Sequence, residues 1–465
     1  MKKKIFLFAC IILAVIFFNV TSVFAQQVPK APAAIEKTLR GMDISIGLWW
    51  RYYDTNANPP SNQWVGSEWQ EKQLDYRKRL LRQYNFTMSE KNIASWKEMP
   101  QLAATSIMAG KPAATIFALQ PDWALALYRQ NLLYPVGSSK AVNWASTTPF
   151  EWNKAVTKAF TFKNGRTQDA YAFCDEIGGS EHSACVFFNK RLFREAGLDP
   201  NLLYDLQKAG TWTWDKFMEI AKKLTRDTNN DGITDIYAMT CDLSSEILDA
   251  LVSSNGAMYV DRDKNGMLVN ASNRPEFLEA VRFYMQLRDA KVMKPKPPGD
   301  NTPWNWFIPE FNDGKVAMRI DQQYLATNDL RTMKDDWGMV LPPKGPRAKN
   351  YVVFTDENVR VIPAKGYTKE QIDAIIWAYQ AWVTPPDYDW KKEIYPKYRD
   401  RRAVDETFAI IRDQKYWQWK YHLHVPGLQR GGIAWEIWWH DGEPAQLVEK
   451  VQNSWNALID DANGL

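Results

Sequence analysis

The chain has 465 residues, of which 45% are hydrophobic and 24% charged, and this composition excludes a disordered or fibrous protein. Its 58 Lys and Arg against 54 Asp and Glu give a formal net charge of +4, which excludes a nucleic-acid-binding surface spread over the whole chain. The 22 tryptophans outnumber both the 20 tyrosines and the 21 phenylalanines, and this excess requires an explanation.

The first 25 residues have the pattern of a secretory signal peptide. Lysines at 2–4 precede an apolar run from Ile5 to Val20, and small residues lead to Ala25. We expect cleavage after Ala25, because a run of about 16 apolar residues is shorter than the ~20 needed to cross a bilayer. The mature protein is therefore predicted to be periplasmic or extracellular, and residues 26–39 to form a Pro/Ala-rich leader.

Three cysteines remain in the predicted mature chain, and export places them in an oxidising compartment. Cys174 and Cys185 could close a short loop, leaving Cys241 buried and free. Three buried free thiols are a nearly equal alternative, and the sequence leaves both open.

Strand-like and helix-like segments alternate along the chain, which predicts α/β layers with largely parallel sheets. Ser67 and Gln70 form a capping-box pattern at the start of a helix with an apolar stripe. The expected strands are 43–50, 113–119, 170–173, 185–188 and 359–362. The other expected helices begin near Thr213 and Thr368, which act as caps, and near Pro275 and Pro444.

Common catalytic signatures are absent from the sequence: it has no nucleotide-binding glycine motif, no HExxH and no GxSxG. His422 and His424 alternate along an expected strand and could bind a metal, but two exposed histidines are the better interpretation. Glycoside hydrolysis needs only two suitably spaced acids, so a secreted carbohydrate-active enzyme is an open alternative. Its candidate carboxylate pairs are Asp175 with Glu176 and Asp356 with Glu357.

Five blocks resemble, in order, the extracellular solute-binding proteins of ABC importers, in particular the maltose-binding-protein-like group that carries sugars. The longest block is 183–200 (SACVFFNKRLFREAGLDP), and the next begins at 213 with TWDKF. The three shorter blocks are 107–112, 314–318 and 337–342.

The resemblance implies a periplasmic-binding-protein type II fold, with two α/β lobes of mixed, mainly parallel sheets joined by a multi-segment hinge. It places residues 40–177 and 322–372 in an N-terminal lobe, and 183–318 and 378–465 in a C-terminal lobe. The implied crossings between the lobes lie near 175–182, 320–323 and 374–384.

The resemblance also implies a carbohydrate ligand, most simply an oligosaccharide, that is captured in a cleft between the lobes and delivered to ABC permease subunits. It implies no enzymatic activity, no nucleic-acid partner and a monomer. A sensor module that presents the same ligand to a membrane receptor is a further alternative.

The tryptophan excess suits a carbohydrate, because aromatic rings cover the C–H face of a sugar while carboxylates and amides bind its hydroxyls. Tryptophans on helical stripes are expected in the core, and those that follow strands are expected at the ligand. Arg51, Arg319 and Arg360 could serve a uronate. From strand ends and from the resemblance, the expected ligand-binding residues are Trp49, Trp50, Trp123, Asp175, Glu176, Gln322, Gln323, Tyr324, Glu357 and Asn358.

Residues 227–235 (DTNNDGITD) resemble a calcium-binding loop, with Gly232 at the sixth position for the sharp turn. Ala238 stands where an EF-hand has its glutamate, so the site would be incomplete, and a turn without metal is equally consistent. A structural Ca²⁺ is thus an open expectation, and the weaker pattern at 261–266 predicts a hairpin turn. The expected calcium ligands are Asp227, Asn229, Asp231, Ile233 through its carbonyl, and Asp235.

Overall fold

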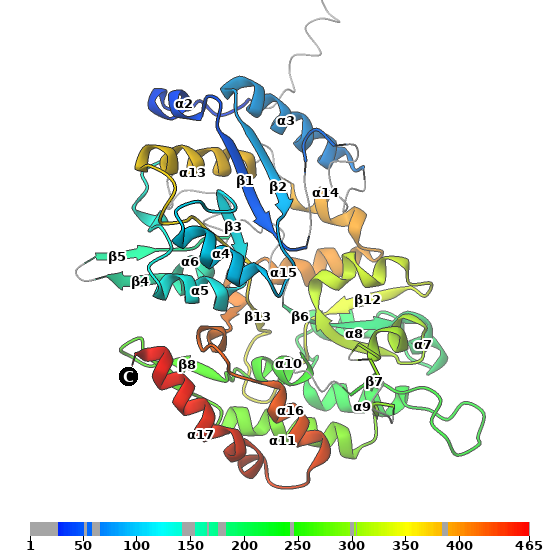
Figure 1. Cartoon of the computed structure of the whole chain (residues 1–465). Helices are drawn as coiled ribbons and strands as arrows, with labels where there is room; N and C mark the ends of the chain where they lie inside the picture. Colours follow the sequence, from blue (N-terminus) through cyan, green and yellow to red (C-terminus); the bar gives the residue numbers. More distant parts are fainter. Residues whose placement is uncertain are drawn as a thin grey trace, which may run out of the picture.

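The described residues of the computed structural model form two α/β lobes, which Figure 1 shows one above the other. The predicted signal peptide, Arg51 and the first implied crossing with Asp175 and Glu176 lie outside these residues. The described ranges are 27–50, 54–57, 66–141, 154–164, 167–174, 183–241, 246–297, 302–303, 305–383 and 389–464.

The N-terminal lobe is built on a four-stranded sheet in the order β14-β3-β1-β2. Strand β1 (Asp43–Leu48) pairs in parallel with β2 (Thr87–Asn92) and β3 (Ile116–Leu119), whereas β14 (Val359–Val361) is antiparallel to β3. Alternate residues of β3 enter two separate cores, which is why this strand is apolar throughout. The lobe's other elements are α2 (Ala33–Leu39), α3 (Glu68–Tyr84), α4 (Met99–Met108), α5 (Pro121–Arg129), η1 (Val136–Ser138), α6 (Lys154–Ala159), β4 (Thr161–Asn164), β5 (Thr167–Ala170) and α13 (Lys369–Val383).

The predicted leader is part of this lobe. Ile35 and Leu39 of α2 are buried in the same core as α13, and the Ala31 amide donates to the hydroxyl of Tyr84 at 2.9 Å. Residues 31–39 are therefore packed structure, because Ala31, Ile35 and Leu39 are buried in this core.

Two of the three predicted helix caps form. Ser67 Oγ accepts a hydrogen bond from the Gln70 backbone amide at 3.2 Å, and Gln70 Oε1 accepts one from the Ser67 backbone amide. Thr368 and Gln371 make the same reciprocal pair. Thr213 precedes α9 (Trp214–Leu224) but makes no side-chain cap; its backbone instead forms a β-bridge with Lys344. A capping box can be predicted from the sequence because both partners lie within one helical turn. The bridge to Lys344 cannot, because its partner lies far away in the chain.

The C-terminal lobe has a central sheet in the order β11-β6-β12. Both β11 (Met318–Gln322) and β12 (Trp337–Val340) run antiparallel to β6 (Ala184–Asn189), so the predicted parallel character holds mainly for the other lobe. Its remaining elements are α7 (Lys190–Glu195), α8 (Leu202–Lys208), α9, β7 (Met239–Thr240), α10 (Glu246–Ser254), β8 (Val260–Arg262), β9 (Leu268–Asn270), α11 (Pro275–Asp289), β10 (Met293–Lys294), α12 (Phe307–Asn312), η2 (Gln323–Thr327), η3 (Asp329–Thr332), β13 (Val353–Thr355), α14 (Trp390–Ile394), η4 (Tyr395–Lys397), η5 (Ala403–Phe408), α15 (Ala409–Ile411), η6 (Gln414–Tyr416), β15 (Trp417–Trp419), η7 (Tyr421–His424), α16 (Gly431–Trp439) and α17 (Pro444–Asn463).

The chain passes between the lobes at places that differ from the implied ones. Residues 325–353, expected with the N-terminal lobe, contribute buried side chains to the C-terminal core, because β12 pairs with β6. All of α13 up to Val383 packs in the N-terminal core. The crossing within the described residues therefore lies near 354–358, between β13 and β14.

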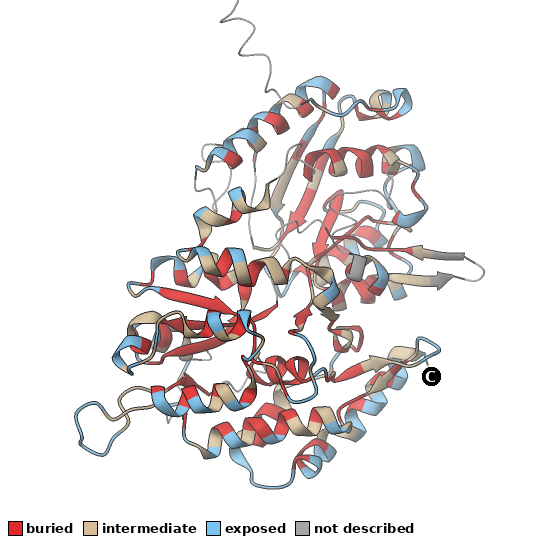
Figure 2. Cartoon of the chain, turned by 180° about the vertical axis from the view of Figure 1, so that it is seen from behind, coloured by how far each residue is buried: buried red, intermediate tan, exposed pale blue. Residues whose placement is uncertain are grey.

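Figure 2 shows buried elements, in red, in both lobes. Cys174, Cys185 and Cys241 are all buried free thiols, which is the second of the two alternatives left open for them.

Within the described part of the chain, every helix is too short or too polar to span a lipid bilayer.

His422 and His424 are buried, 3% and 2% exposed, so the expectation of exposed histidines is wrong. They lie in the turn η7 rather than on a strand. There His422 contacts Tyr259 of the C-terminal lobe, and His424 contacts Phe160 of the N-terminal lobe. Burial lowers the pKa of both imidazoles to about 3, so both are neutral at pH 7.

We expect stability to fall as the pH drops below about 6.5, because the unfolded histidines take up protons that the folded ones exclude. Each depressed histidine contributes about 1.4 kcal/mol per pH unit in this window. Asp321 acts in the opposite direction, since burial and the neighbouring Glu246 raise its pKa. The net expected loss is therefore about 1–3 kcal/mol per pH unit, measured by urea unfolding at several pH values.

The variant His422→Phe keeps an aromatic ring against Tyr259 and should flatten this pH dependence by about half. The matched control is His440→Phe, because His440 is the exposed histidine that follows α16. A slope unchanged by His422→Phe would contradict the assignment.

Candidate ligand-binding site

Four tryptophans follow the carboxyl ends of three neighbouring strands. Trp49 and Trp50 follow β1, Trp96 comes four residues after β2, and Trp123 lies at the start of α5 just after β3. Because β1, β2 and β3 are parallel, these three strand ends meet at one edge of the sheet, where open α/β sheets bind ligands. The predicted residues Trp49, Trp50 and Trp123 are therefore brought together by the fold.

The rings of these tryptophans are in direct contact. Ring centroids are 4.2 Å apart for Trp49 and Trp50, and 4.9 Å apart for Trp49 and Trp123. The Trp96 ring continues the series at 5.5 Å from Trp123. Trp49 and Trp123 also pack against one core of the N-terminal lobe, and Trp50 against the other, so the inner rings have fixed positions. We refer to the four residues as the tryptophan cluster.

The crossing that leads into β14 ends at the same edge. Val359 pairs with Leu119, the last residue of β3, so Glu357 and Asn358 immediately precede this edge. Glu357 is 1% exposed, and Asp356 adds to the burial that raises the pKa of Asp122. Two predicted ligand-binding residues thus lie beside the tryptophan cluster.

Lys420 joins this edge to the C-terminal lobe. Its Nζ lies 3.0 Å from Asp356 Oδ1, with both side chains largely buried. Burial by itself lowers the pKa of Lys420, but Asp356, Glu246 and Glu357 outweigh it and the pKa is raised. A buried ammonium with three carboxylates around it therefore stands between the lobes.

On the C-terminal side, Gln322 is the last residue of β11, and Gln323 and Tyr324 follow it. Gln322 pairs with Ala184, where the chain enters β6, and the Gln323 amide donates to the Ser183 carbonyl at 2.9 Å. These residues therefore lie at the end of the sheet that faces the crossing. Burial raises the pKa of Tyr324 to about 12, with Asp321 and Glu246 among the contributors.

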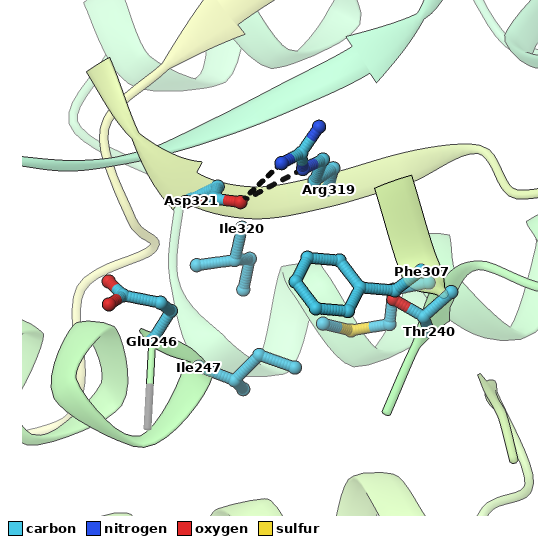
Figure 3. A pocket seen from close by; sticks show the side chains of 8 residues that line it. Thr240, Glu246, Ile247, Phe307, Arg319, Ile320 and Asp321 are labelled. Atoms are coloured by element: carbon cyan, nitrogen blue, oxygen red, sulfur yellow. Dashed lines mark hydrogen bonds and ion pairs between the residues drawn. The ribbon is translucent and has the colours of Figure 1, made fainter. Parts of the chain in front are cut away.

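A small pocket lies beside these residues (Figure 3). Arg319 Nε and Nη2 donate to Asp321 Oδ2 at 2.9 and 2.7 Å, and Glu246 begins α10 opposite them. Its free volume is about 10 Å³, which leaves room for about one water molecule and not for a sugar unit. The other lining residues are Met239, Thr240, Ile247, Phe307 and Ile320.

A family model described as "Bacterial extracellular solute-binding protein" matches residues 92–390, which is most of the chain. The chain belongs to the bacterial extracellular solute-binding proteins. No curated protein matches the sequence.

Solved structures of such proteins share the fold of this solute-binding protein at low sequence identity. The cyclic alpha-maltosyl-1,6-maltose binding protein of Arthrobacter globiformis has a TM-score of 0.60 at 13% identity, covering 90% of this chain and 100% of that one. An ABC substrate-binding protein of Listeria monocytogenes in complex with cycloalternan has 0.58 at 16%, covering 90% and 98%. The maltotriose binding protein of Thermus thermophilus has 0.52 at 17%, covering 90% and 99%.

Three residues at this edge were not predicted from the sequence. Trp96 follows a polar strand and carries no strand-end signal as strong as that of Trp123. Glu246 and Lys420 are ordinary surface residues by type, and Lys420 lies 64 positions after Asp356 in the sequence. Lys420 reaches the site because β15, just before it, pairs with β13.

The predicted calcium loop lies elsewhere, on the exposed segment between α9 and β7 that projects from the C-terminal lobe (Figure 1). Its carboxylates accept the loop's own amides: Asp227 from Asn230 and Gly232 at 2.7 Å each, and Asp231 from Ile233 at 2.8 Å. Among the described residues no three His, Cys, Asp or Glu side chains converge as a metal site. Calcium binding by this loop stays a prediction.

Removal of calcium tests that prediction. If the loop binds Ca²⁺, EDTA should lower the melting temperature of the unaltered protein by a few degrees, because a ligand of the folded state alone stabilises it. The variant Asp227→Ala should then no longer respond to EDTA. Identical melting curves of the unaltered protein with and without EDTA would contradict calcium binding.

Proposed function

We propose that this solute-binding protein captures an oligosaccharide between its two lobes and delivers it to an ABC permease. The observation that carries the proposal is the tryptophan cluster beside buried carboxylates at the edge between the lobes. Indole rings cover the C–H face of a sugar, and carboxylates and amides accept or donate to its hydroxyls. Solved structures of the same fold include complexes with cycloalternan and maltotriose, which supports this class of ligand.

Capture requires that the ligand stabilises a closed arrangement of the lobes. The ligand would contact Trp49, Trp50 and Trp123 from one lobe and Tyr324 and Gln322 from the other. Lys420 and Glu357, beside the crossing between the lobes, would bind hydroxyls of a sugar held by both lobes.

A thermal-shift screen against a panel of oligosaccharides tests the proposal. A ligand that binds only the folded protein raises its melting temperature, and we expect at least one oligosaccharide to do so. The same mixtures, incubated for long periods, should contain no cleavage product, whereas product formation would favour a hydrolase. An absence of any shift across neutral, amino and acidic sugars would contradict the proposed function.

The charges at the site favour a neutral sugar over a uronate. Two donors of Arg319 are engaged by Asp321, and Arg360 donates to the Tyr379 hydroxyl and the Asn358 carbonyl at 3.1 and 3.0 Å. Both guanidinium groups are buried. Arg319 Nη1 has no hydrogen-bond partner among the described residues, but it is buried, and Arg51 lies outside those residues. Within the described part of the site, a ligand carboxylate would therefore meet the carboxylates around Lys420.

We expect a neutral oligosaccharide to bind at least about tenfold more tightly than a uronate oligosaccharide of the same length, because like charges in a poorly solvated site repel. Isothermal titration calorimetry with matched neutral and uronate oligosaccharides measures the ratio. Tighter binding of the uronate would contradict the expectation.

A further inference from the structure

Trp96 is an exposed tryptophan next to the candidate site. Its side chain is 52% exposed, which places it among the few large apolar residues of the described chain that face solvent. Trp435 and Trp439 are comparably exposed, at 49% and 53%, but they lie on α16 of the C-terminal lobe. An indole ring left half in water has apolar area available to a partner.

The turn that carries Trp96 is held in place on both sides. Ser95 Oγ donates to Glu98 Oε2 at 2.6 Å, and the Ser95 amide donates to the same oxygen at 3.1 Å. The Met99 amide donates to the Ser95 carbonyl at 3.0 Å, which continues the turn into α4. The ring is therefore presented on an ordered turn, so little conformational entropy would be lost when a ligand covers it.

Ring contacts also connect Trp96 to the other three residues of the tryptophan cluster. Its ring meets that of Trp123 at an interplanar angle of 60°, and Trp123 meets Trp49 at the same angle. Because the inner three rings are half-buried and Trp96 is exposed, the cluster leads from the lobe junction outward to solvent. Trp96 is its outer end.

A polar group beside the cluster indicates what kind of partner would cover it. Asp122 precedes Trp123, and its Oδ1 is buried without a hydrogen-bond partner among the described residues. An apolar partner would leave this carboxylate oxygen unsatisfied, at a cost of about 1–3 kcal/mol. A sugar would offer a C–H face to the indole rings and a hydroxyl to Asp122.

We propose that Trp96 is the outer wall of the ligand site and stacks on a sugar unit beyond those held by Trp49, Trp50 and Trp123. This inference rests on the proposed function and deepens it. The ligand then has at least one unit that projects from the lobe junction, and affinity rises with chain length until Trp96 is covered.

Calorimetric titrations with a chain-length series test the proposal. The probes are glucose, maltose, maltotriose and maltotetraose and the corresponding mannose series, and the series bound by the unaltered protein is titrated into Trp96→Ala. Affinity for the longest bound member should fall about tenfold, as loss of one stacked ring predicts, while affinity for the shortest stays within about twofold. The matched control is Trp439→Ala, which removes an equally exposed indole from the other lobe.

A second measurement, of tryptophan fluorescence, reports on the Trp96 ring directly. Acrylamide quenches the fluorescence of exposed tryptophans, and the longest ligand should protect part of that fluorescence in the unaltered protein and in Trp439→Ala. In Trp96→Ala this protection should be smaller, because only the half-buried rings of the cluster remain to be covered.

Each other outcome overturns the inference. An equal loss of affinity at every chain length would show that Trp96 only supports Trp123, and no loss would show that it does not touch the ligand. Binding of a monosaccharide alone would overturn the outer wall but leave the proposed function intact. Binding of no sugar in either series would overturn the inference, and only a failure of the wider thermal-shift panel would overturn the proposed function.

Discussion

Replacement of Trp123 by alanine is expected to weaken oligosaccharide binding about 30- to 150-fold, which corresponds to about 2–3 kcal/mol. Trp123 contacts both Trp49 and Trp96, at 4.9 and 5.5 Å between ring centroids. Its removal therefore deletes one aromatic face and also loosens the rings on either side. Isothermal titration calorimetry with the best ligand from the thermal-shift screen measures the change.

Because Trp123 also packs on the N-terminal core, its alanine variant needs a control for folding. Trp123→Phe keeps part of the buried ring and should recover much of the affinity, and Trp435→Ala removes an exposed indole from the distant α16. Melting temperatures of all three variants separate lost binding from lost structure. An affinity within about threefold of the unaltered value in a folded Trp123→Ala protein would place the sugar elsewhere.

Replacement of Lys420 by alanine is expected to lower the free energy of unfolding by about 3–5 kcal/mol, the usual cost of removing one partner from a buried ion pair. The Lys420 Nζ lies 3.0 Å from Asp356 Oδ1, and their side chains are only 6% and 17% exposed. Without the ammonium, the carboxylates of Asp356, Glu357 and Glu246 would repel one another at the junction of the lobes. Urea unfolding at pH 7 measures the loss.

The surface pair of Lys415 and Asp413 provides the matched control. Its Nζ–Oδ2 distance is 2.5 Å, but the side chains are 65% and 39% exposed, so Lys415→Ala should leave the unfolding curve almost unchanged. The double variant Lys420→Met with Asp356→Asn should recover part of the lost stability, because it leaves neither charge of the pair behind. A loss of under about 1 kcal/mol in Lys420→Ala would contradict a buried pair.

Local sequence patterns were sufficient to predict several helices and one strand. The capping boxes at Ser67 and Thr368 form as predicted because both partners lie within one helical turn. The apolar run before Pro121 becomes the buried strand β3, whose two faces both meet a core. Prolines at 275 and 444 open α11 and α17.

Long-range packing explains two expectations that were wrong: the lobe of residues 325–353 and the exposure of His422 and His424. Residues 325–353 join the C-terminal core because β12 pairs with β6, which is about 150 residues earlier in the chain. The histidines at 422 and 424 are buried because η7 lies between Tyr259 of one lobe and Phe160 of the other. Neither partner is visible from the neighbouring sequence.

For the candidate site, the sequence by itself determined the family resemblance and the aromatic residues that end β1 and begin α5, because strand ends and their flanking residues are local features. Only the tertiary structure decided that Trp96 extends these rings and that Lys420 sits among three carboxylates between the lobes. Ring contacts and buried charge pairs depend on which distant segments meet. That is set by the burial of two whole cores rather than by any one segment's pattern.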